Sequence, residues 1–328
     1  MKRFFCRGAL AALLSSSLLS AAAPSHAAGY PSKAITIVVG YPAGGSVDLT
    51  ARVFGEALSE RLGQSVVIEN LGGAGGTIGA NRVARATADG YTLLVGSTNE
   101  MVIAGMINSA VRYDGLKDFT PVGMIAAQPM MLVASRETGV TNAAQYLEKL
   151  KQGASGAYTF GSSGVGTALH LAGEMINEST QTHAEHIPYR GVSPLLTDLV
   201  SGQLDFGVFV MSSGLPHVKS GKVVALGVTE TQASPAAPDI PALSGTPGFE
   251  KVDINVWFGL YGPAGLPDDV VAALRSALDD ILQQDAFREK MAASGATLYQ
   301  PGMDAAQFQV TETEKYGRLV KLAKIERQ

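Results

Sequence analysis

Residues 35–62 read ITIVVGYPAGGSVDLTARVFGEALSERL and outline one strand, one turn and one helix. The run 35–39 predicts a buried strand, because β-branched side chains pack well in a sheet. Between 47 and 62, the residues Leu49, Val53 and Ala57 recur on one helical face. The glycine-rich segment 40–45 joins the two elements. A strand, a tight turn and a helix in this order are typical of a parallel α/β sheet.

The same alternation continues to the end of the chain. Further strands are predicted at 66–69, 92–95, 130–134, 158–160, 185–188, 205–210, 223–228 and 256–261, and helices at 77–87, 141–151, 166–178, 192–201 and, two or three of them, within 267–322. The pattern restarts near residue 130 and ends in a helical return. We therefore expect an α/β protein of two lobes, with crossovers near 126–129 and 261–265. Lobe I would hold 28–127 and 263–328, and lobe II 128–262.

The first 27 residues have the composition of a signal peptide. Lys2, Arg3 and Arg7 precede an apolar run from 8 to 23, and Ser25-His26-Ala27 offers small residues at the −3 and −1 positions. A membrane anchor would need about 20 strongly apolar residues, and this run is shorter and rich in serine. The sequence therefore predicts export to the periplasm and cleavage after Ala27.

Charge and cysteine content exclude several classes of function. Without 1–27 the chain keeps 22 of its 25 basic residues against 29 acidic ones, which disfavours nucleic acid and anionic membranes as partners. Cys6 belongs to the predicted signal peptide, so no disulfide or thiolate metal site is expected. His183 and His186 are spaced three apart near a strand, where they would face opposite sides. No metal and no cofactor are predicted.

Four polar loops follow predicted strands, where ligands of open α/β sheets bind. In the first loop, glycines allow close backbone approach and the helix start offers free N–H groups to an anion. Its alternative reading is a tight turn in which Asp48 caps the helix. The residues of this loop that could contact a ligand are Tyr41, Ala43, Gly44, Gly45, Ser46 and Asp48.

The second loop, GGAGGTIG at 72–79, lacks the G-x-G-x-x-G register because residue 78 is isoleucine, and it has no Walker lysine. It is better read as a helix-start loop that lines a cleft with Thr77. The fourth loop offers Ser97 and Thr98 after the strand at 92–95. The third loop, 161–170, contains the candidates Ser162, Ser163, Gly166, Thr167 and His170.

Two functions fit these loops. Neutral hydroxyl and amide donors without an acid–base pair are typical of a site that binds an anion and performs no chemistry on it. The alternative is a serine hydrolase that uses Ser162 or Ser163. However, GSSG at 161–164 does not match the G-x-S-x-G elbow of such enzymes. A third reading, a scaffold without a small-molecule role, also stays open.

Taken together, the motifs resemble those of the substrate-binding proteins of tripartite tricarboxylate transporters, the TctC or Bug family. The resemblance covers nearly the whole chain after residue 27. It rests on YPSK at 30–33, GYPAGGSVD at 40–48, EN at 69–70, GGTIGA at 75–80, ADGYTL at 88–93, HLAGE at 170–174, IPYRG at 187–191, GQLD at 202–205, WFGL at 257–260 and GPAG at 262–265.

This resemblance implies a type II periplasmic-binding fold whose lobes close on a carboxylate such as citrate, a dicarboxylate or an aromatic acid. It maps the family's ligand loops onto Tyr41 to Asp48, onto Ser97 and Thr98, and onto Ser162 to His170. The implied partners are the membrane subunits of a tripartite transporter or the periplasmic domain of a sensor kinase, with the protein itself a monomer and not an enzyme.

The sequence departs from the family pattern at two places. Phe209 stands where many relatives carry an aspartate that faces the cleft, so an amino-acid ligand would lack a partner for its ammonium group. This favours a simple or aromatic carboxylate and places Phe209 in the cleft wall. Glu100 is also unusual after the loop at 97–98, and it predicts a reshaped wall there.

Overall fold

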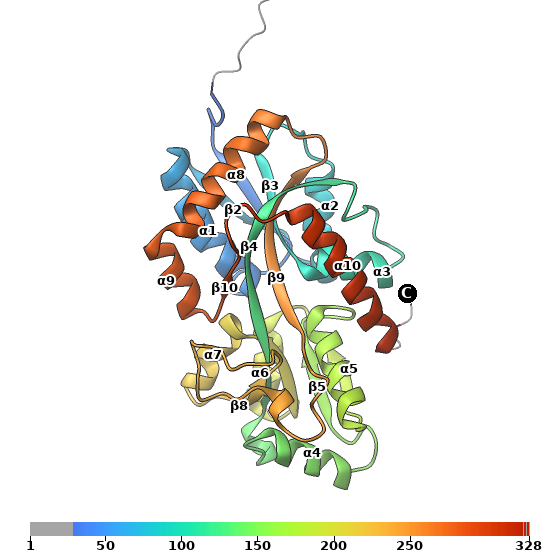
Figure 1. Cartoon of the computed structure of the whole chain (residues 1–328). Coiled ribbons are helices and arrows are strands. Elements are labelled where there is room, and N and C mark those ends of the chain that lie inside the picture. Colours follow the sequence, from blue (N-terminus) through green and yellow to red (C-terminus); the bar gives the residue numbers. More distant parts are fainter. Residues whose placement is uncertain (1–28, 324, 326, 328) are drawn as a thin grey trace, which may run out of the picture.

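The computed structural model describes residues 29–323, 325 and 327. The predicted signal peptide and its cleavage site lie outside these residues. The chain forms two α/β lobes stacked along one long axis and joined by two long strands (Figure 1). The predicted two-lobed α/β architecture is confirmed.

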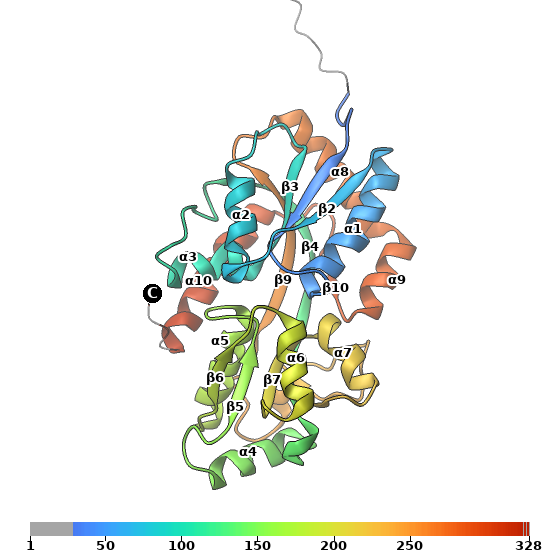
Figure 2. The ribbon, with the colours of Figure 1, turned by 180° about the vertical axis from the view of Figure 1, so that it is seen from behind.

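Lobe I is built on a sheet with the order β2-β1-β3-β9-β4. The pairs β1–β2 and β1–β3 are parallel, whereas β9 runs antiparallel to β3 and β4. Helices α1, α8 and α9 lie on one side of this sheet, and α2, α3 and α10 lie on the other (Figures 1 and 2). The elements are β1 (Ile35–Val39), α1 (Ser46–Leu62), β2 (Val66–Asn70), α2 (Thr77–Ala84), β3 (Thr92–Ser97), α3 (Ala104–Ile107), α8 (Asp268–Gln283), α9 (Asp285–Ala293), β10 (Thr297–Leu298) and α10 (Ala305–Leu322).

Lobe II continues the sheet with β7, β5 and β6, and β8 pairs with the end of β4. Its strands alternate faces in the expected way. Phe206, Val208 and Val210 join the main core with α5, and Phe209 joins a second core with Leu195 of α6. The elements are α4 (Ala143–Gln152), β5 (Thr159–Ser162), α5 (Ala168–Thr180), β6 (Glu185–Pro188), α6 (Val192–Ser201), β7 (Phe206–Val210), α7 (Met211–Lys219) and β8 (Val224–Val228).

Two strands, β4 (Phe119–Ala134) and β9 (Asn255–Pro263), connect the lobes. β4 pairs with β9 over 119–129 and with β7 over 130–134, a change of partner that favours the crossover proposed at 126–129. The second crossover is predicted at 261–265, and the pairing of β9 favours an earlier position. Residues 258–261 of β9 already pair with 94–97 of β3, a lobe I strand. We therefore propose that the return boundary of the lobes lies near residue 254.

The sequence patterns missed helices α3 and α7, the short strand β10 and the first two thirds of β4. α7 contains Gly214 and Pro216, two poor helix formers, and its short apolar pattern gave no helical signal. The predicted strand 130–134 is only the last third of β4.

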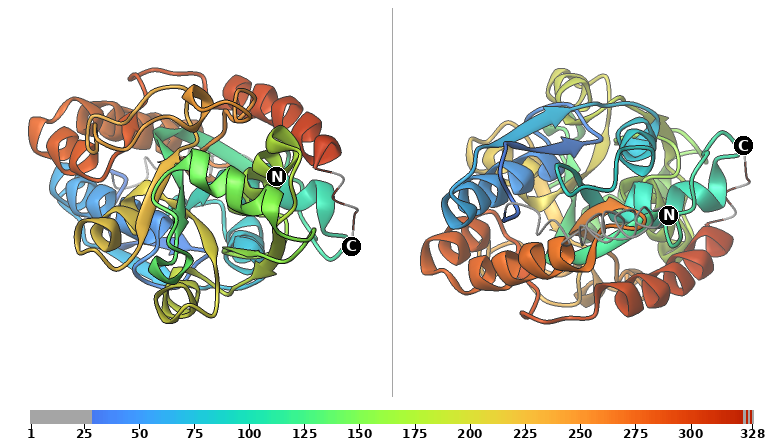
Figure 3. Two further views of the ribbon diagram at one scale, coloured as in Figure 1. Left: turned by 90° about the horizontal axis from the view of Figure 1, so that it is seen from below. Right: turned by 90° about the horizontal axis from the view of Figure 1, so that it is seen from above.

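Seen along the long axis, α1, α8 and α9 again lie on one side of lobe I and α2, α3 and α10 on the other (Figure 3). Among the described residues, no helix is both long and apolar enough to span a membrane.

Candidate ligand-binding site

A cavity of about 730 Å³, counted with its opening to solvent, lies between the two lobes. It is lined from lobe I, including β9, by Tyr41, Pro42, Ala43, Gly45, Ser46, Val47, Ser97, Asn99 and Val256, and from lobe II by Ser163, Ala168, Leu169, Arg190, Gly191, Val192, Ser193, Pro194, Val210 and Ser213. The lining therefore combines two strand-end loops of lobe I with three loops of lobe II.

The N-terminal ends of helices α1 and α6 lie at the cavity. α1 begins at Ser46 and α6 begins at Val192, and both residues line the cavity. At the start of α1, the first helical hydrogen bond is donated by Leu49 N to Gly45 O. The amides of Ser46 and Val47 precede this bond and are therefore free to bind an anion. The positive end of each helix dipole adds to this preference.

Among the described residues that line the cavity, Arg190 is the one with a charged side chain. It precedes Gly191, the residue before α6, and its guanidinium forms no ion pair with another residue of the part that the structure describes. A planar guanidinium binds a carboxylate through two parallel hydrogen bonds. The sequence reasoning quoted Arg190 within a motif but did not place it in the site. Its position after the strand end at Pro188 was the signal that could have found it.

Much of the remaining wall is apolar. The apolar lining residues are Val47, Leu169, Val192, Val210 and Val256, and no aspartate or glutamate of the part that the structure describes lines the cavity. Apolar walls with a few convergent donors are typical of sites for small organic ligands. Among the described residues, the lining can thus accommodate a hydrocarbon chain or ring that carries a carboxylate, and it offers no carboxylate partner to an ammonium group.

Asp48 shapes the first loop from beneath the cavity. Its Oδ2 accepts hydrogen bonds from Gly44 N at 2.8 Å and Arg52 Nε at 2.9 Å, and its Oδ1 accepts one from Asn70 Nδ2 at 2.9 Å. Burial alone would raise the pKa of Asp48, but the hydrogen bonds from Arg52, Gly44 and Asn70 outweigh it and keep the pKa below its ordinary value. Asp48 therefore holds the loop in place and does not line the cavity.

The two lobes touch each other beside the cavity. Asn99 Nδ2 donates to Tyr41 Oη at 2.8 Å, and Asn99 Oδ1 accepts from Ala168 N at 2.6 Å across the gap between the lobes. Ile107 lies against Gly166, where an added Cβ would come within 1.4 Å of its Cδ1. The side chain of Asn99 thus caps the first free amide of α5 from the opposite lobe.

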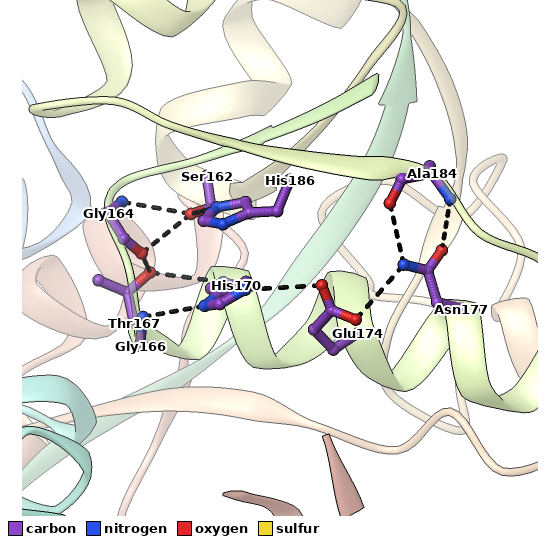
Figure 4. A network of polar contacts seen from close by, with 9 residues as sticks. All are labelled: Ser162, Gly164, Gly166, Thr167, His170, Glu174, Asn177, Ala184 and His186. Atoms are coloured by element: carbon purple, nitrogen blue, oxygen red, sulfur yellow. Dashed lines mark hydrogen bonds and ion pairs between the residues drawn. The ribbon is translucent and has the colours of Figure 1, made fainter. Parts of the chain in front are cut away.

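Buried Ser162 and His170 and partly buried His186 form a cluster in lobe II, and none of the three lines the cavity (Figure 4). Ser162 Oγ lies 2.6 Å from His186 Nε2, and the His186 ring stacks on His170 with centroids 3.7 Å apart. His170 Nδ1 accepts from Gly166 N at 2.9 Å, and His170 Nε2 lies 3.5 Å from Glu174 Oε1.

This cluster resembles a serine–histidine pair but has no access to a substrate. Ser162 has an exposed fraction of 0 %, and its hydroxyl also contacts the Gly164 backbone. Burial, and then the neighbouring His170, lower the pKa of His186 to about 3, so the ring is neutral at ordinary pH. The geometry therefore gives no support to the hydrolase reading, and the cluster is a packed anchor between β5, β6 and α5.

Of the predicted site residues, six line the cavity: Tyr41, Ala43, Gly45, Ser46, Ser97 and Ser163. Nine lie outside its lining: Gly44, Asp48, Thr77, Thr98, Ser162, Gly166, Thr167, His170 and Phe209. Ligand contact by the first group stays a prediction. The sequence reasoning left out Asn99 and, besides Arg190, the residues 191–194 at the start of α6.

Several of these nine residues have local structural roles instead. Thr167 is the N-cap of α5, and its hydroxyl accepts from His170 N at 3.4 Å. Thr98 Oγ1 accepts from Trp257 N at 3.0 Å. The placement of Phe209 in the cleft wall is corrected, because neighbouring strand residues face opposite sides and Val210 lines the cavity in its place.

No group of three or more His, Cys, Asp or Glu side chains within the described residues is arranged to hold a metal ion.

Comparison with known proteins places this architecture in one family. The sequence pattern described as "tripartite tricarboxylate transporter family receptor" matches residues 50–325. Protein BugT of Bordetella pertussis is 32% identical over 277 residues, which cover 84% of this chain and 84% of BugT.

Two solved structures share the whole fold. The periplasmic binding protein BugD superposes with a TM-score of 0.85 at 31% identity, covering 91% of this chain and 100% of that one. Rpa4515 of R. palustris, solved with adipate, gives a TM-score of 0.85 at 28% identity and covers 90% of this chain and 99% of that one. The expected periplasmic-binding-protein fold is confirmed by these similarities.

Proposed function

The chain belongs to the tripartite tricarboxylate transporter receptor family, and we propose that it captures a small organic carboxylate in the cavity between its lobes. The observation that carries this proposal is the placement of Arg190 and the free amides at the start of α1 on the same cavity. One positive side chain and two helix starts, with no acidic residue in the lining, favour an anion.

The available interactions are sufficient for useful affinity. Hydrogen bonds to a charged group contribute about 1.5–3 kcal/mol each, and a helix end adds about 0.3–2 kcal/mol. A micromolar complex requires about 8 kcal/mol, so a few such contacts reach it even after part is lost to the cost of association.

The presence of two donor groups and apolar surface in one cavity favours a dicarboxylate. One carboxylate would lie at Ser46 and Val47, and a second at Arg190 and the start of α6, with Leu169 and Val210 against the carbon chain between them. Adipate, the ligand in the Rpa4515 structure, has this chemistry. A monocarboxylate with an aromatic ring would use the same apolar wall and one of the two donor groups.

We further propose that the protein works in the periplasm as a monomer and performs no chemistry on its ligand. Its partner would be the membrane subunits of a tripartite transporter, or alternatively the periplasmic domain of a sensor kinase. Either partner would recognise the closed arrangement of the lobes.

A thermal shift screen tests the binding proposal. A ligand that binds only the folded state raises the melting temperature, and at 100 times its Kd it adds about 2.7 kcal/mol of stability. We expect a shift with at least one of adipate, malate, citrate and benzoate, and none with lysine or arginine. Mass spectrometry should recover that ligand unchanged after prolonged incubation. A flat response to every carboxylate would contradict the proposal.

A further inference from the structure

Glu100 is a buried carboxyl group directly behind the wall of the cavity. Its exposed fraction is 1 %. Oε1 accepts from Ser97 N at 2.7 Å, and Oε2 lies 2.6 Å from Ser97 Oγ and 3.1 Å from Tyr41 Oη. Ser97 and Tyr41 both line the cavity, whereas Glu100 does not. A single layer of side chains therefore separates this carboxyl from any bound ligand.

No lysine, arginine or histidine pairs with Glu100 within the described residues. The nearest titratable groups are three tyrosines, of which Tyr113 donates from Oη to Glu100 O at 2.7 Å. Burial raises the pKa of Tyr41, Tyr113 and Tyr261, so none of them ionises near neutral pH. The charged groups on the elements packed around Glu100 already have partners: Asp114 with Lys117, and Glu312 with Lys315 and Trp257.

The hydrogen bonds around Glu100 accommodate a proton on the carboxyl. Tyr41 has a single hydroxyl hydrogen, and the closest acceptor for it is Gly75 O at 2.7 Å. The hydroxyl oxygen of Tyr41 in turn accepts from Asn99 Nδ2. When Glu100 is ionised, its carboxylate can only accept hydrogen bonds. It then cannot donate to Tyr41 Oη, and it accepts the hydroxyl hydrogen of Ser97. A protonated Glu100 can instead donate from Oε2 to Ser97 Oγ. The Ser97 hydrogen is then free to turn toward the cavity.

These contacts connect the protonation of Glu100 with the binding of an anion. In the ionised state, Glu100 occupies the Ser97 donor and adds a negative charge behind the site. In the protonated state, both obstacles to a carboxylate are removed. Burial raises the pKa of Glu100 to about 7, with the hydrogen bonds from Ser97 and Tyr41 offsetting part of the effect, so both states are populated near neutral pH.

We propose that Glu100 takes up one proton from solvent when a carboxylate binds, and that Ser97 passes the effect to the ligand by turning its hydroxyl hydrogen into the cavity. Glu100 is thus a positioning residue that makes the site proton-coupled. This inference rests on the proposed carboxylate binding and adds a pH dependence to it.

The sign of the effect follows from linkage. A negatively charged ligand favours the neutral form of a nearby carboxyl, so bound Glu100 should titrate at a higher pH than free Glu100. Between the pKa of Glu100 in the free protein and its pKa in the complex, the complex binds more protons than the free protein. The affinity for the ligand therefore falls as the pH rises through this range. The fall should approach tenfold per pH unit above pH 7, because one pKa unit corresponds to a factor of ten in binding.

Calorimetry between pH 6.5 and 8.5 tests the proposal, with whichever of adipate, malate, citrate and benzoate gives the largest thermal shift. At pH 8 the binding enthalpy measured in Tris and in phosphate should differ by the amount that proton uptake predicts. Glu100→Gln, whose amide can donate to Ser97 Oγ, should bind with nearly equal Kd at pH 6.5 and 8.5 and show no buffer dependence.

Glu230→Gln is the matched control. Glu230 also has a pKa raised first by burial, but it accepts from Asn255 Nδ2 at 3.1 Å, and Asn255, unlike Ser97 and Tyr41, does not line the cavity. This variant should keep the pH dependence of the wild type. If Glu100→Gln does not fold, carbon-detected NMR of the Glu100 carboxyl in the wild type, with and without ligand, measures the same shift.

The outcomes separate this inference from the proposed function. If none of the four carboxylates binds at pH 6.5, carboxylate binding itself is contradicted and the inference falls with it. If one binds with the same Kd at pH 6.5 and 8.5 and the same enthalpy in both buffers, only the proton coupling is overturned. The same holds if Glu100→Gln retains the full pH dependence.

Discussion

Arg190→Met should weaken carboxylate binding by roughly 10- to 150-fold, which corresponds to the loss of about 1.5–3 kcal/mol from hydrogen bonds to a charged group. Arg190 is exposed, makes no ion pair within the described residues and is the one charged residue of the cavity lining. Methionine keeps much of the side-chain length without the charge. The melting temperature of the ligand-free protein should therefore change little.

Calorimetry on the two proteins measures this effect. The matched control is Arg85→Met, since Arg85 is an exposed arginine at the end of α2 that does not line the cavity. It should bind like the wild type. Equal affinities for wild type and Arg190→Met would contradict the role of Arg190 in binding the carboxylate and would mean that the anion binds elsewhere.

Asn99→Ala should lower the affinity by about 5- to 150-fold through its effect on closure. The side chain of Asn99 is the acceptor for Ala168 N across the lobes, at 2.6 Å. Without it, closing the lobes buries an amide that has lost its partner, at a cost of about 1–3 kcal/mol. In an open protein the same amide is hydrated, so the cost falls on the closed state and appears as a faster ligand release.

Stopped-flow dissociation and small-angle scattering distinguish this effect from a loss of direct ligand contact. Asn99→Ala should raise the dissociation rate and give a larger radius of gyration than wild type at the same ligand saturation. Asn108→Ala is the control, because the Asn108 side chain bonds only within its own loop, to Ala110 N at 2.8 Å. An unchanged dissociation rate in Asn99→Ala would contradict the role of this residue in closure.

The local patterns of the sequence predicted most elements of the fold and the first ligand loop. β1, the turn at 40–45 and α1 are contiguous, so strand propensity, glycine and helical spacing identify them without knowledge of the partners. Tyr41 and Ser46 follow the end of β1 and Ser97 is the last residue of β3, so all three lie at strand ends of the parallel part of the sheet and line the cavity, and their contact with a ligand stays a prediction.

The parts that could not be predicted depend on contacts between distant segments. The family pattern placed Phe209 in the cleft wall, but in the structure Val210 lines the cavity and Phe209, on the opposite face of the strand, packs in the second core. The assignment of β9 to lobe I depends on its pairing with β3, more than 150 residues earlier. The bond between Asn99 and Ala168 exists only when the lobes meet.

In the third loop, 161–170, the sequence could not show whether the polar side chains bind a ligand or the protein itself. Ser162, Thr167 and His170 are polar residues at a strand end and a helix start, a pattern that also describes a ligand loop. In the structure their hydrogen bonds are directed to Gly164, Gly166 and His186, inside lobe II. Polar side chains in such a loop either reach a ligand or satisfy the backbone, and only the three-dimensional arrangement distinguishes these roles.

A crystal structure of the protein grown with the best carboxylate of the screen tests the central claim most directly. The account predicts a closed protein with one ligand carboxylate within hydrogen-bonding distance of the Ser46 and Val47 amides or the Arg190 guanidinium, and its carbon atoms against Leu169 and Val210. An empty cavity at saturating ligand, or a ligand bound outside the space between the lobes, would contradict it.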